Sequence, residues 1–201
     1  TPVTAHLLAE LAQHAGLPAG VLNIVHGKGP TAGAALVTHA DVPTISFTGS
    51  TLVGRWIGRE CGDRLKRVSL ELGGKNPFIV FSDANLPAAL AAATAAGFTN
   101  QGQVCLCGSR LLIHDSIYDQ FVPEFTARIQ SLRSGDPSDP ATQQGALTSA
   151  EHLAKVESYV DLARQLGGRI LCGGARISPS LLPARCKSGY FFAPTLIEGL
   201  D

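Results

Sequence analysis

The 201-residue sequence contains no methionine and begins with threonine. Because an open reading frame normally starts with methionine, we expect the chain to be an internal segment of a longer protein. The sequence also lacks a surplus of charge, since 16 Lys and Arg residues balance 16 Asp and Glu residues. Nucleic acids and anionic membrane surfaces attract strongly basic proteins, so we expect neither as a partner.

Long apolar runs and paired cysteine spacings are missing as well. No apolar stretch reaches the roughly 18 to 20 residues that cross a bilayer, and no secretory signal opens the chain. The cysteines number five, an odd count without the spacing of a disulfide framework, which predicts a reducing compartment and hence the cytosol. Cys105 and Cys107 lie close together, but no second Cys/His pair accompanies them, so we predict no metal site.

What the sequence does contain is a regular alternation of short apolar runs and helical patterns. With 45% hydrophobic residues, the chain can bury one large core or parts of two. This alternation predicts an α/β fold built on a parallel sheet. The expected strands cover residues 21–25, 44–47, 67–70, 77–81, 111–113, 169–172 and 190–192. The expected helices cover about residues 7–12, 31–37, 51–61, 86–96, 116–132 and 150–166.

Two glycine-containing turns follow predicted strands, at residues 27–33 and 47–54. In parallel sheets, ligands bind where the carboxyl ends of strands meet the amino ends of helices, because free backbone N–H groups and the helix dipole favour phosphate there. Neither turn has the full Gly-x-Gly-x-x-Gly spacing. Taken alone, each turn is therefore more typical of an ordinary strand-to-helix connection, in which Ser50 does no more than cap its helix.

Glu71 and Cys105 are a carboxylate and a thiol of the types needed for base and nucleophile chemistry. Cys105 follows a polar stretch, Asn100-Gln101-Gly102-Gln103-Val104, where the thiol could face a cleft. By residue type alone, a buried structural cysteine and a surface glutamate are the more common outcomes. A thiol hydrolase remains open too, with a histidine partner distant in sequence.

The combination of motifs resembles the aldehyde dehydrogenase superfamily. Three runs carry the resemblance: Phe47-Thr48-Gly49-Ser50-Thr51, Leu70-Glu71-Leu72-Gly73-Gly74-Lys75-Asn76-Pro77, and Asn100-Gln101-Gly102-Gln103-Val104-Cys105 with Arg110. Their order and spacing agree with the family from Thr1 to Asp201. The resemblance implies an aldehyde dehydrogenase-like α/β fold that is incomplete at both ends: residues 1–73 would end the parallel-sheet NAD-binding domain and residues 74–201 would form much of an α/β catalytic domain.

The resemblance also implies roles for individual residues. Cys105 would be the nucleophile that forms a thiohemiacetal and then a thioester, and Glu71 the base that activates water. The expected cofactor is NAD, with NADP left open, and no metal is expected. The cofactor-binding residues implied are Gly29, Pro30, Gly33, Thr48, Gly49, Ser50, Leu72 and Gly73.

Softer features point to one branch of the family. Four segments resemble the 2-aminomuconic and 2-hydroxymuconic semialdehyde dehydrogenases, whose substrates are small carboxylate-bearing aldehydes. They are Val104-Cys105-Leu106-Cys107-Gly108-Ser109-Arg110, the Gly135-Asp136-Pro137-Ser138-Asp139-Pro140 loop, Leu182-Pro183-Ala184-Arg185 and Gly189-Tyr190-Phe191. Three family features are absent: an upstream asparagine of the oxyanion hole, an upstream Lys/Glu pair at the cofactor ribose, and a downstream Glu-x-Phe-Gly-Pro run. The isolated chain is therefore expected to be inactive, and the full-length enzyme to be a dimer or tetramer.

Overall fold

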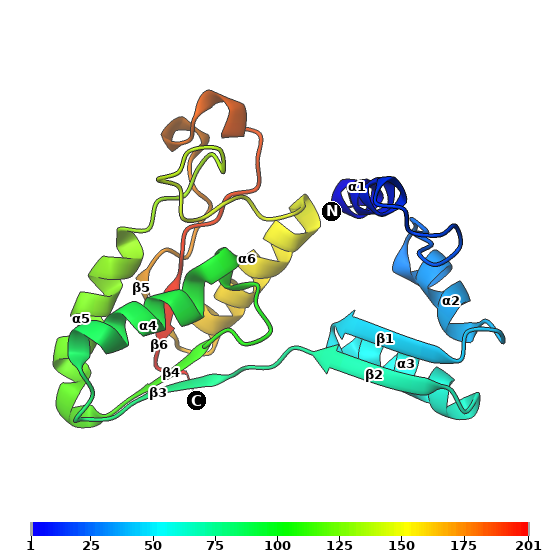
Figure 1. The fold of residues 1–201 in the computed structure, drawn as a ribbon. Helices are drawn as coiled ribbons and strands as arrows, with labels where there is room; N and C mark the ends of the chain where they lie inside the picture. Colours follow the sequence, from blue (N-terminus) through cyan, green and yellow to red (C-terminus); the bar gives the residue numbers. More distant parts are fainter. Residues whose placement is uncertain (1, 201) are drawn as a thin grey trace. The chain divides into compact units, whose positions relative to one another are not determined.

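The computed structural model describes residues 2–200, and these form two compact units that divide between Gly73 and Gly74. Each unit has its own strands, helices and apolar core (Figure 1). The polypeptide passes from one unit to the other at the Gly73–Gly74 peptide bond.

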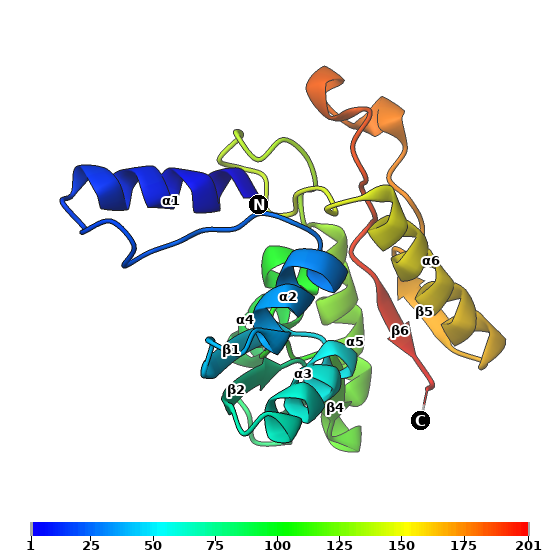
Figure 2. The same ribbon diagram turned by 90° about the vertical axis from the view of Figure 1, so that its right-hand side faces the viewer.

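The first unit is built on two parallel strands, β1 (Thr44–Gly49) and β2 (Arg67–Leu72), joined by helix α3 (Thr51–Asp63). A parallel pair needs such a crossover, because the chain must return to the same end of the sheet. Helix α2 (Ala34–Thr38) packs against α3, as Figure 2 shows, while α1 (Pro2–His14) buries none of its residues. The core consists of Val37, Ile45, Ile57 and Cys61.

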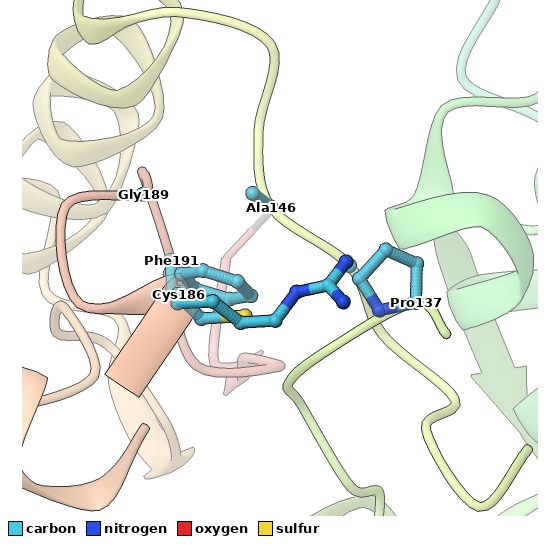
Figure 3. A pocket seen from close by; sticks show the side chains of 7 residues that line it. Pro137, Ala146, Cys186, Gly189 and Phe191 are labelled. Carbon is cyan, nitrogen blue, oxygen red and sulfur yellow. The ribbon is translucent and has the colours of Figure 1, made fainter. Parts of the chain in front are cut away.

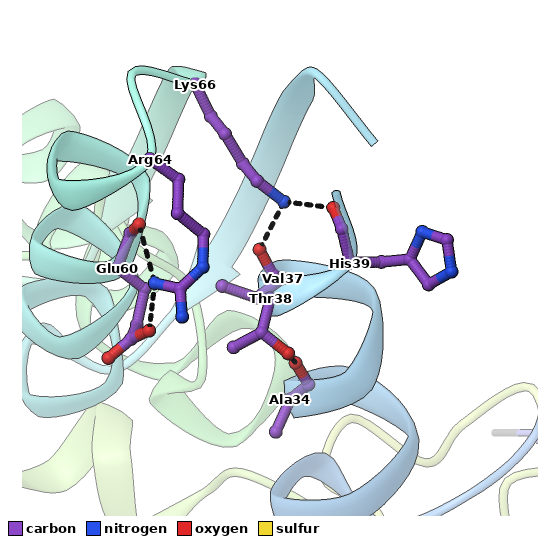
Figure 4. A network of polar contacts seen from close by, with 7 residues as sticks. All are labelled: Ala34, Val37, Thr38, His39, Glu60, Arg64 and Lys66. Atoms are coloured by element: carbon purple, nitrogen blue, oxygen red, sulfur yellow. Dashed lines mark hydrogen bonds and ion pairs between the residues drawn. The ribbon is translucent and has the colours of Figure 1, made fainter. Parts of the chain in front are cut away.

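Lys66 links the elements of this unit at the end of the sheet where β1 and β2 begin (Figure 4). Its ammonium group donates hydrogen bonds to the carbonyls of Val37 at 2.7 Å and His39 at 2.6 Å, where α2 ends. Carbonyls at the end of a helix lack partners inside the helix, and a cation there also interacts favourably with the helix dipole. The contact ties the end of α2 to the start of β2.

The second unit pairs β3 (Pro77–Val80) with β4 (Arg110–Ile113) in parallel. Helices α4 (Leu86–Phe98) and α5 (Asp115–Gln130) pack on each other beside this pair, and α6 (Ala150–Gln165) lies along β5 (Arg169–Cys172) and β6 (Leu196–Glu198), as Figure 2 shows. The core comprises Val80, Leu90, Ala93, Phe121, Phe125, Ile129 and Cys172.

The predicted α/β fold with parallel strands is confirmed, but two of the predicted strands do not form, and one strand was not predicted. Residues 21–25 form no strand, because no other described segment pairs with them, and Val21 and Val25 remain exposed. Residues 190–192 make only isolated bridges, to Leu147 and Arg176. Strand β6, which was not predicted, pairs with β5 in antiparallel orientation. Among the described residues, no helix is long and apolar enough to cross a membrane.

The second unit should depend strongly on Phe125, whose ring is 1% exposed and contacts Phe121 and Phe98. Replacing Phe125 by Ala removes these contacts and leaves a cavity, so we expect the free energy of unfolding to fall by about 3–5 kcal/mol. Urea denaturation followed by circular dichroism measures the change. Tyr159→Ala, at an exposed position of α6, is the control and should change stability by less than about 0.5 kcal/mol. Equal losses in the two variants would contradict this account of the core.

Candidate active site

The parallel register of β1 and β2 brings several of the predicted site residues to one edge of the first unit. Thr48 lies beside Glu71 and Gly49 beside Leu72, at the carboxyl ends of the two strands. Ser50 follows directly and starts α3. We call this set of five residues the carboxyl edge. In α/β sheets, such an edge is the usual place for a ligand.

Ser50 and Gly54 fix the start of α3 against the carboxyl edge. The Ser50 hydroxyl accepts a hydrogen bond from the Val53 amide at 3.3 Å, which is the helix cap predicted from the sequence. A side chain on Gly54 would start 2.6 Å from a methyl carbon of Leu72, so any larger residue there would require the Leu72 side chain to shift. The amino end of α3 therefore lies next to the last residue of β2.

Gly29, Pro30 and Gly33 lie in a separate turn, η1 (Gly29–Gly33), which leads into α2. The amides of Thr31 and Ala32 donate to the Lys28 carbonyl at 3.1 and 2.9 Å, so the chain begins to coil immediately after Lys28. Apart from the adjoining residues and the backbone of the turn itself, no atom of the described residues lies within 4 Å of where a side chain on Gly29 or Gly33 would start. The turn thus has an open surface that a ligand could approach.

Cys105 belongs to the second unit, in a loop of residues 99–109 that we call the cysteine loop. Its first part is a run of three residues in the left-handed region: Asn100 at φ 51°, Gln101 at φ 55° and Gly102 at φ 69°. For a residue with a side chain, this conformation costs roughly 1–2 kcal/mol. The surrounding structure must therefore hold this part of the loop in place.

Gln144 supplies part of that support. It is the one polar residue that is buried among those described, at 6% exposure, and its side-chain amide donates to the Phe98 carbonyl at 2.7 Å. Its neighbour Gly145 lies against Gln101, whose side-chain oxygen can accept from the Gly145 amide at 2.9 Å. The segment around Gln144 therefore holds the end of α4 and the left-handed run together.

Cys105 itself lies exposed in the turn that follows, which the Cys107 amide closes by donating to the Val104 carbonyl at 2.9 Å. Cys107 is half-buried, and its thiol donates to the Gly97 carbonyl at 3.4 Å. Burial raises the pKa of the Cys107 thiol, against a smaller opposing effect of Lys75. The two nearby cysteines therefore differ: Cys105 is accessible, and Cys107 is a protonated structural donor.

Asn76 is a residue of this site that the sequence reasoning missed. Its side-chain nitrogen donates to the carbonyls of both Cys105, at 2.8 Å, and Cys107, at 3.1 Å. The sequence offered one signal, since Asn76 lies in the motif run that contains Glu71. Neither periodicity nor residue type could show that the amide reaches a loop 29 residues further along the chain.

The second unit also has an open hollow of about 430 Å³, shown in Figure 3. It is lined by Pro137, Gly145, Ala146, Arg185, Cys186, Gly189 and Phe191. Arg185 is already paired with Asp136, at 2.9 Å, and donates to the Ser138 hydroxyl at 3.2 Å. None of the predicted catalytic or cofactor-binding residues lines this hollow.

Comparison with known proteins identifies the family to which these motifs belong. A family model described as "Aldehyde dehydrogenase family" matches residues 1–201. The chain belongs to the aldehyde dehydrogenase family. The 5-carboxymethyl-2-hydroxymuconate semialdehyde dehydrogenase of Escherichia coli is 49% identical over 201 residues, and the human 2-aminomuconic semialdehyde dehydrogenase is 47% identical over 200. Each comparison covers 100% of this chain, but 42% and 41% of the respective relative.

Solved structures of similar sequence have the same fold. The crystal structure of a putative aldehyde dehydrogenase from Burkholderia cenocepacia superposes with a TM-score of 0.93 at 48% identity, covering 100% of this chain and 40% of that one. The crystal structure of PnpE in complex with nicotinamide adenine dinucleotide superposes with a TM-score of 0.93 at 46% identity, covering 99% of this chain and 40% of that one. The aldehyde dehydrogenase-like fold is therefore confirmed. The chain spans about two-fifths of the length of the curated relatives it matches.

The two cysteines of the loop should react differently with iodoacetamide. We expect Cys105 to be modified first at neutral pH, because it is exposed, whereas Cys107 is half-buried and its raised pKa delays thiolate formation to higher pH. Peptide mass spectrometry gives the rate at each site. The buried Cys61, Cys172 and Cys186 should stay protected in the folded chain, and all five cysteines should react in urea. Equal rates for Cys105 and Cys107 before unfolding would contradict the distinction.

Proposed function

We propose that this segment belongs to an enzyme that oxidises an aldehyde to a carboxylic acid with NAD(P), using Cys105 as nucleophile and Glu71 as base. The observation that carries the proposal is the cysteine loop: an exposed thiol at the family's nucleophile motif, in a turn whose main chain is held by hydrogen bonds on several sides. An accessible thiol on a well-ordered turn suits attack on a carbonyl carbon.

The chemistry follows from the two side chains. The Cys105 thiolate would add to the aldehyde carbon, and the Cys105 backbone N–H could help to stabilise the oxyanion of the thiohemiacetal. NAD(P)⁺, when bound, supplies the acceptor for the hydride that leaves this carbon, so that a thioester remains on Cys105. Glu71 would then take a proton from water, the resulting hydroxide attacks the thioester, and the carboxylate product leaves as the thiol is restored.

The first unit would supply the cofactor-binding residues, and the second the nucleophile. The Ser50 hydroxyl and the amino end of α3 suit a pyrophosphate at the carboxyl edge, with Thr48 and Gly49 beside it. Leu72 and Gly73 would lie near the nicotinamide. The turn that contains Gly29, Pro30 and Gly33 would contact the adenine side of the cofactor, because there is open space beside Gly29 and Gly33.

For the substrate, we propose a small semialdehyde that carries a carboxylate. Two relatives at 47% and 49% identity are named as muconate-type semialdehyde dehydrogenases, and the Leu182-Pro183-Ala184-Arg185 run supports the same branch. A homo-oligomer remains our expectation for the full-length enzyme. The cytosolic location also stays a prediction, because a human mitochondrial aldehyde dehydrogenase is 45% identical over 197 residues.

The role of Cys105 can be tested in a chimera in which these 201 residues replace the matching region of the E. coli relative. With NAD⁺ and the semialdehyde named for that relative, we expect NADH formation, and a loss of roughly 10³-fold or more on Cys105→Ala. Cys186→Ala, which removes a thiol from a different apolar cluster, is the matched control and should retain turnover. A folded chimera that binds NAD⁺ without turnover would instead indicate a non-catalytic segment.

Glu71 should act after hydride transfer. In the same chimera, Glu71→Gln should slow thioester hydrolysis more than thioester formation, so that a burst of NADH survives while steady-state turnover falls roughly 10²-fold or more. Stopped-flow absorbance separates the two phases. Glu60→Gln, on α3 of the same unit, should leave both unchanged. Loss of burst and turnover to the same extent would contradict a role limited to deacylation.

A further inference from the structure

Asn76 lies where two segments of the second unit are joined most closely. Its backbone carbonyl accepts from the Arg110 amide at 3.2 Å, which continues the β3–β4 ladder by one step. The Arg110 side chain donates through Nε to the Lys75 carbonyl at 3.0 Å. These contacts hold the residues before β3 against the end of the cysteine loop, and so bring the Asn76 amide to Cys105.

Both N–H bonds of the Asn76 amide are used on this loop. One points to the Cys105 carbonyl at 2.8 Å and the other to the Cys107 carbonyl at 3.1 Å. The Cys105 carbonyl forms part of the turn closed by Cys107 N–H and Val104 C=O, so its direction sets the turn that carries the nucleophile. Lys and Arg side chains could donate here, but only with a charge; Asn supplies two neutral donors from one short side chain.

The other side of the turn is held by different groups. The Gly108 amide donates to the Ala96 carbonyl at 3.0 Å, and a side chain on Gly108 would come within 3.1 Å of Phe78 and 3.2 Å of Ala96. These contacts fix where the loop ends against α4. These groups do not bond the Cys105 carbonyl. Among the described residues, Asn76 is the one donor to that carbonyl.

We infer that Asn76 is a positioning residue, whose amide fixes the main chain of Cys105 in the orientation that the attack on the aldehyde requires. The inference rests on the function proposed above and adds a residue that acts only through Cys105. The inference predicts that loss of the Asn76 amide has two different effects. The thiol of Cys105 stays reactive toward a small reagent, while its addition to the aldehyde, which depends on the orientation of the main chain, becomes slow.

Two variants test this in the chimera. Asn76→Leu removes both donors at similar size and without charge, and Asn76→Asp keeps the shape but cannot donate while ionised. We expect the rate of the NADH burst and kcat to fall roughly 10²-fold with little change in KM, since small misplacement of a reacting group has effects of this size. Iodoacetamide should still modify Cys105 at a rate within about threefold of the parent, if the thiol environment is unchanged by Asn76→Leu.

A partial rescue distinguishes positioning from general damage. As the pH falls and the introduced carboxyl takes up a proton, Asn76→Asp regains one donor, so its burst rate relative to the parent should rise. Asn76→Leu should show no such rise. Asn85→Asp is the matched control: Asn85 caps α4 by accepting from the Ala88 amide, which a carboxylate does equally well, so all rates should be unchanged.

Hydrogen exchange measures the order of the loop independently of activity. In Asn76→Leu, the amides of residues 104–110 should exchange faster, while those of α5 keep the protection of the parent.

A parental-like burst and unchanged exchange in Asn76→Leu would overturn the inference and leave the proposed function intact. Exposure of Cys61 and Cys172 to alkylation in that variant would also overturn it, because Asn76 would then support the fold as a whole. If the parent chimera folds and binds NAD⁺ but forms no NADH, the proposed function fails, and the exchange of residues 104–110 alone decides whether Asn76 positions the loop.

Discussion

The conformation of the cysteine loop depends on hydrogen bonds to backbone carbonyls that no regular element satisfies. Asn100 and Gln101 are left-handed, and the chain must then turn again at Cys105. Gln144 bonds the carbonyl of Phe98 and Asn76 bonds that of Cys105, each from a segment remote in sequence. Because these donors come from both the start of β3 and the loop before α6, the conformation of the cysteine loop depends on the tertiary structure of the second unit.

The same logic explains what could be predicted from the sequence. Strands β1 and β2 were predicted correctly. They pair with each other and lie against a helix, and their apolar residues contribute to the core of the first unit, so the local sequence pattern reflects the observed structure. Residues 21–25 carry the same β-branched pattern but have no partner strand, so propensity alone gave the wrong result. Strand β6 has only three residues, and its pairing with β5 is a long-range event that no local pattern reports.

The site shows a similar division between local and long-range information. The motif runs predicted Cys105 and Glu71 as site residues, and the structure places Glu71 beside Thr48 at the carboxyl edge, as parallel pairing requires. The motif runs could not predict the roles of Asn76 and Gln144. A side-chain amide gives no periodic signal in the sequence, and its role depends on which backbone carbonyl it bonds in the folded chain. Cys107 illustrates the same limit: two residues from Cys105, it has the opposite environment.

Pro77, the residue after Asn76, affects how readily the Asn76 side chain deamidates. Asparagine side chains deamidate when the backbone nitrogen of the next residue attacks the amide carbon and closes a succinimide ring. Pro77 is the first residue of β3, and proline has no N–H to lose in that reaction. The amide that holds the Cys105 carbonyl is thereby protected from the commonest spontaneous route by which asparagine turns into aspartate as a protein ages.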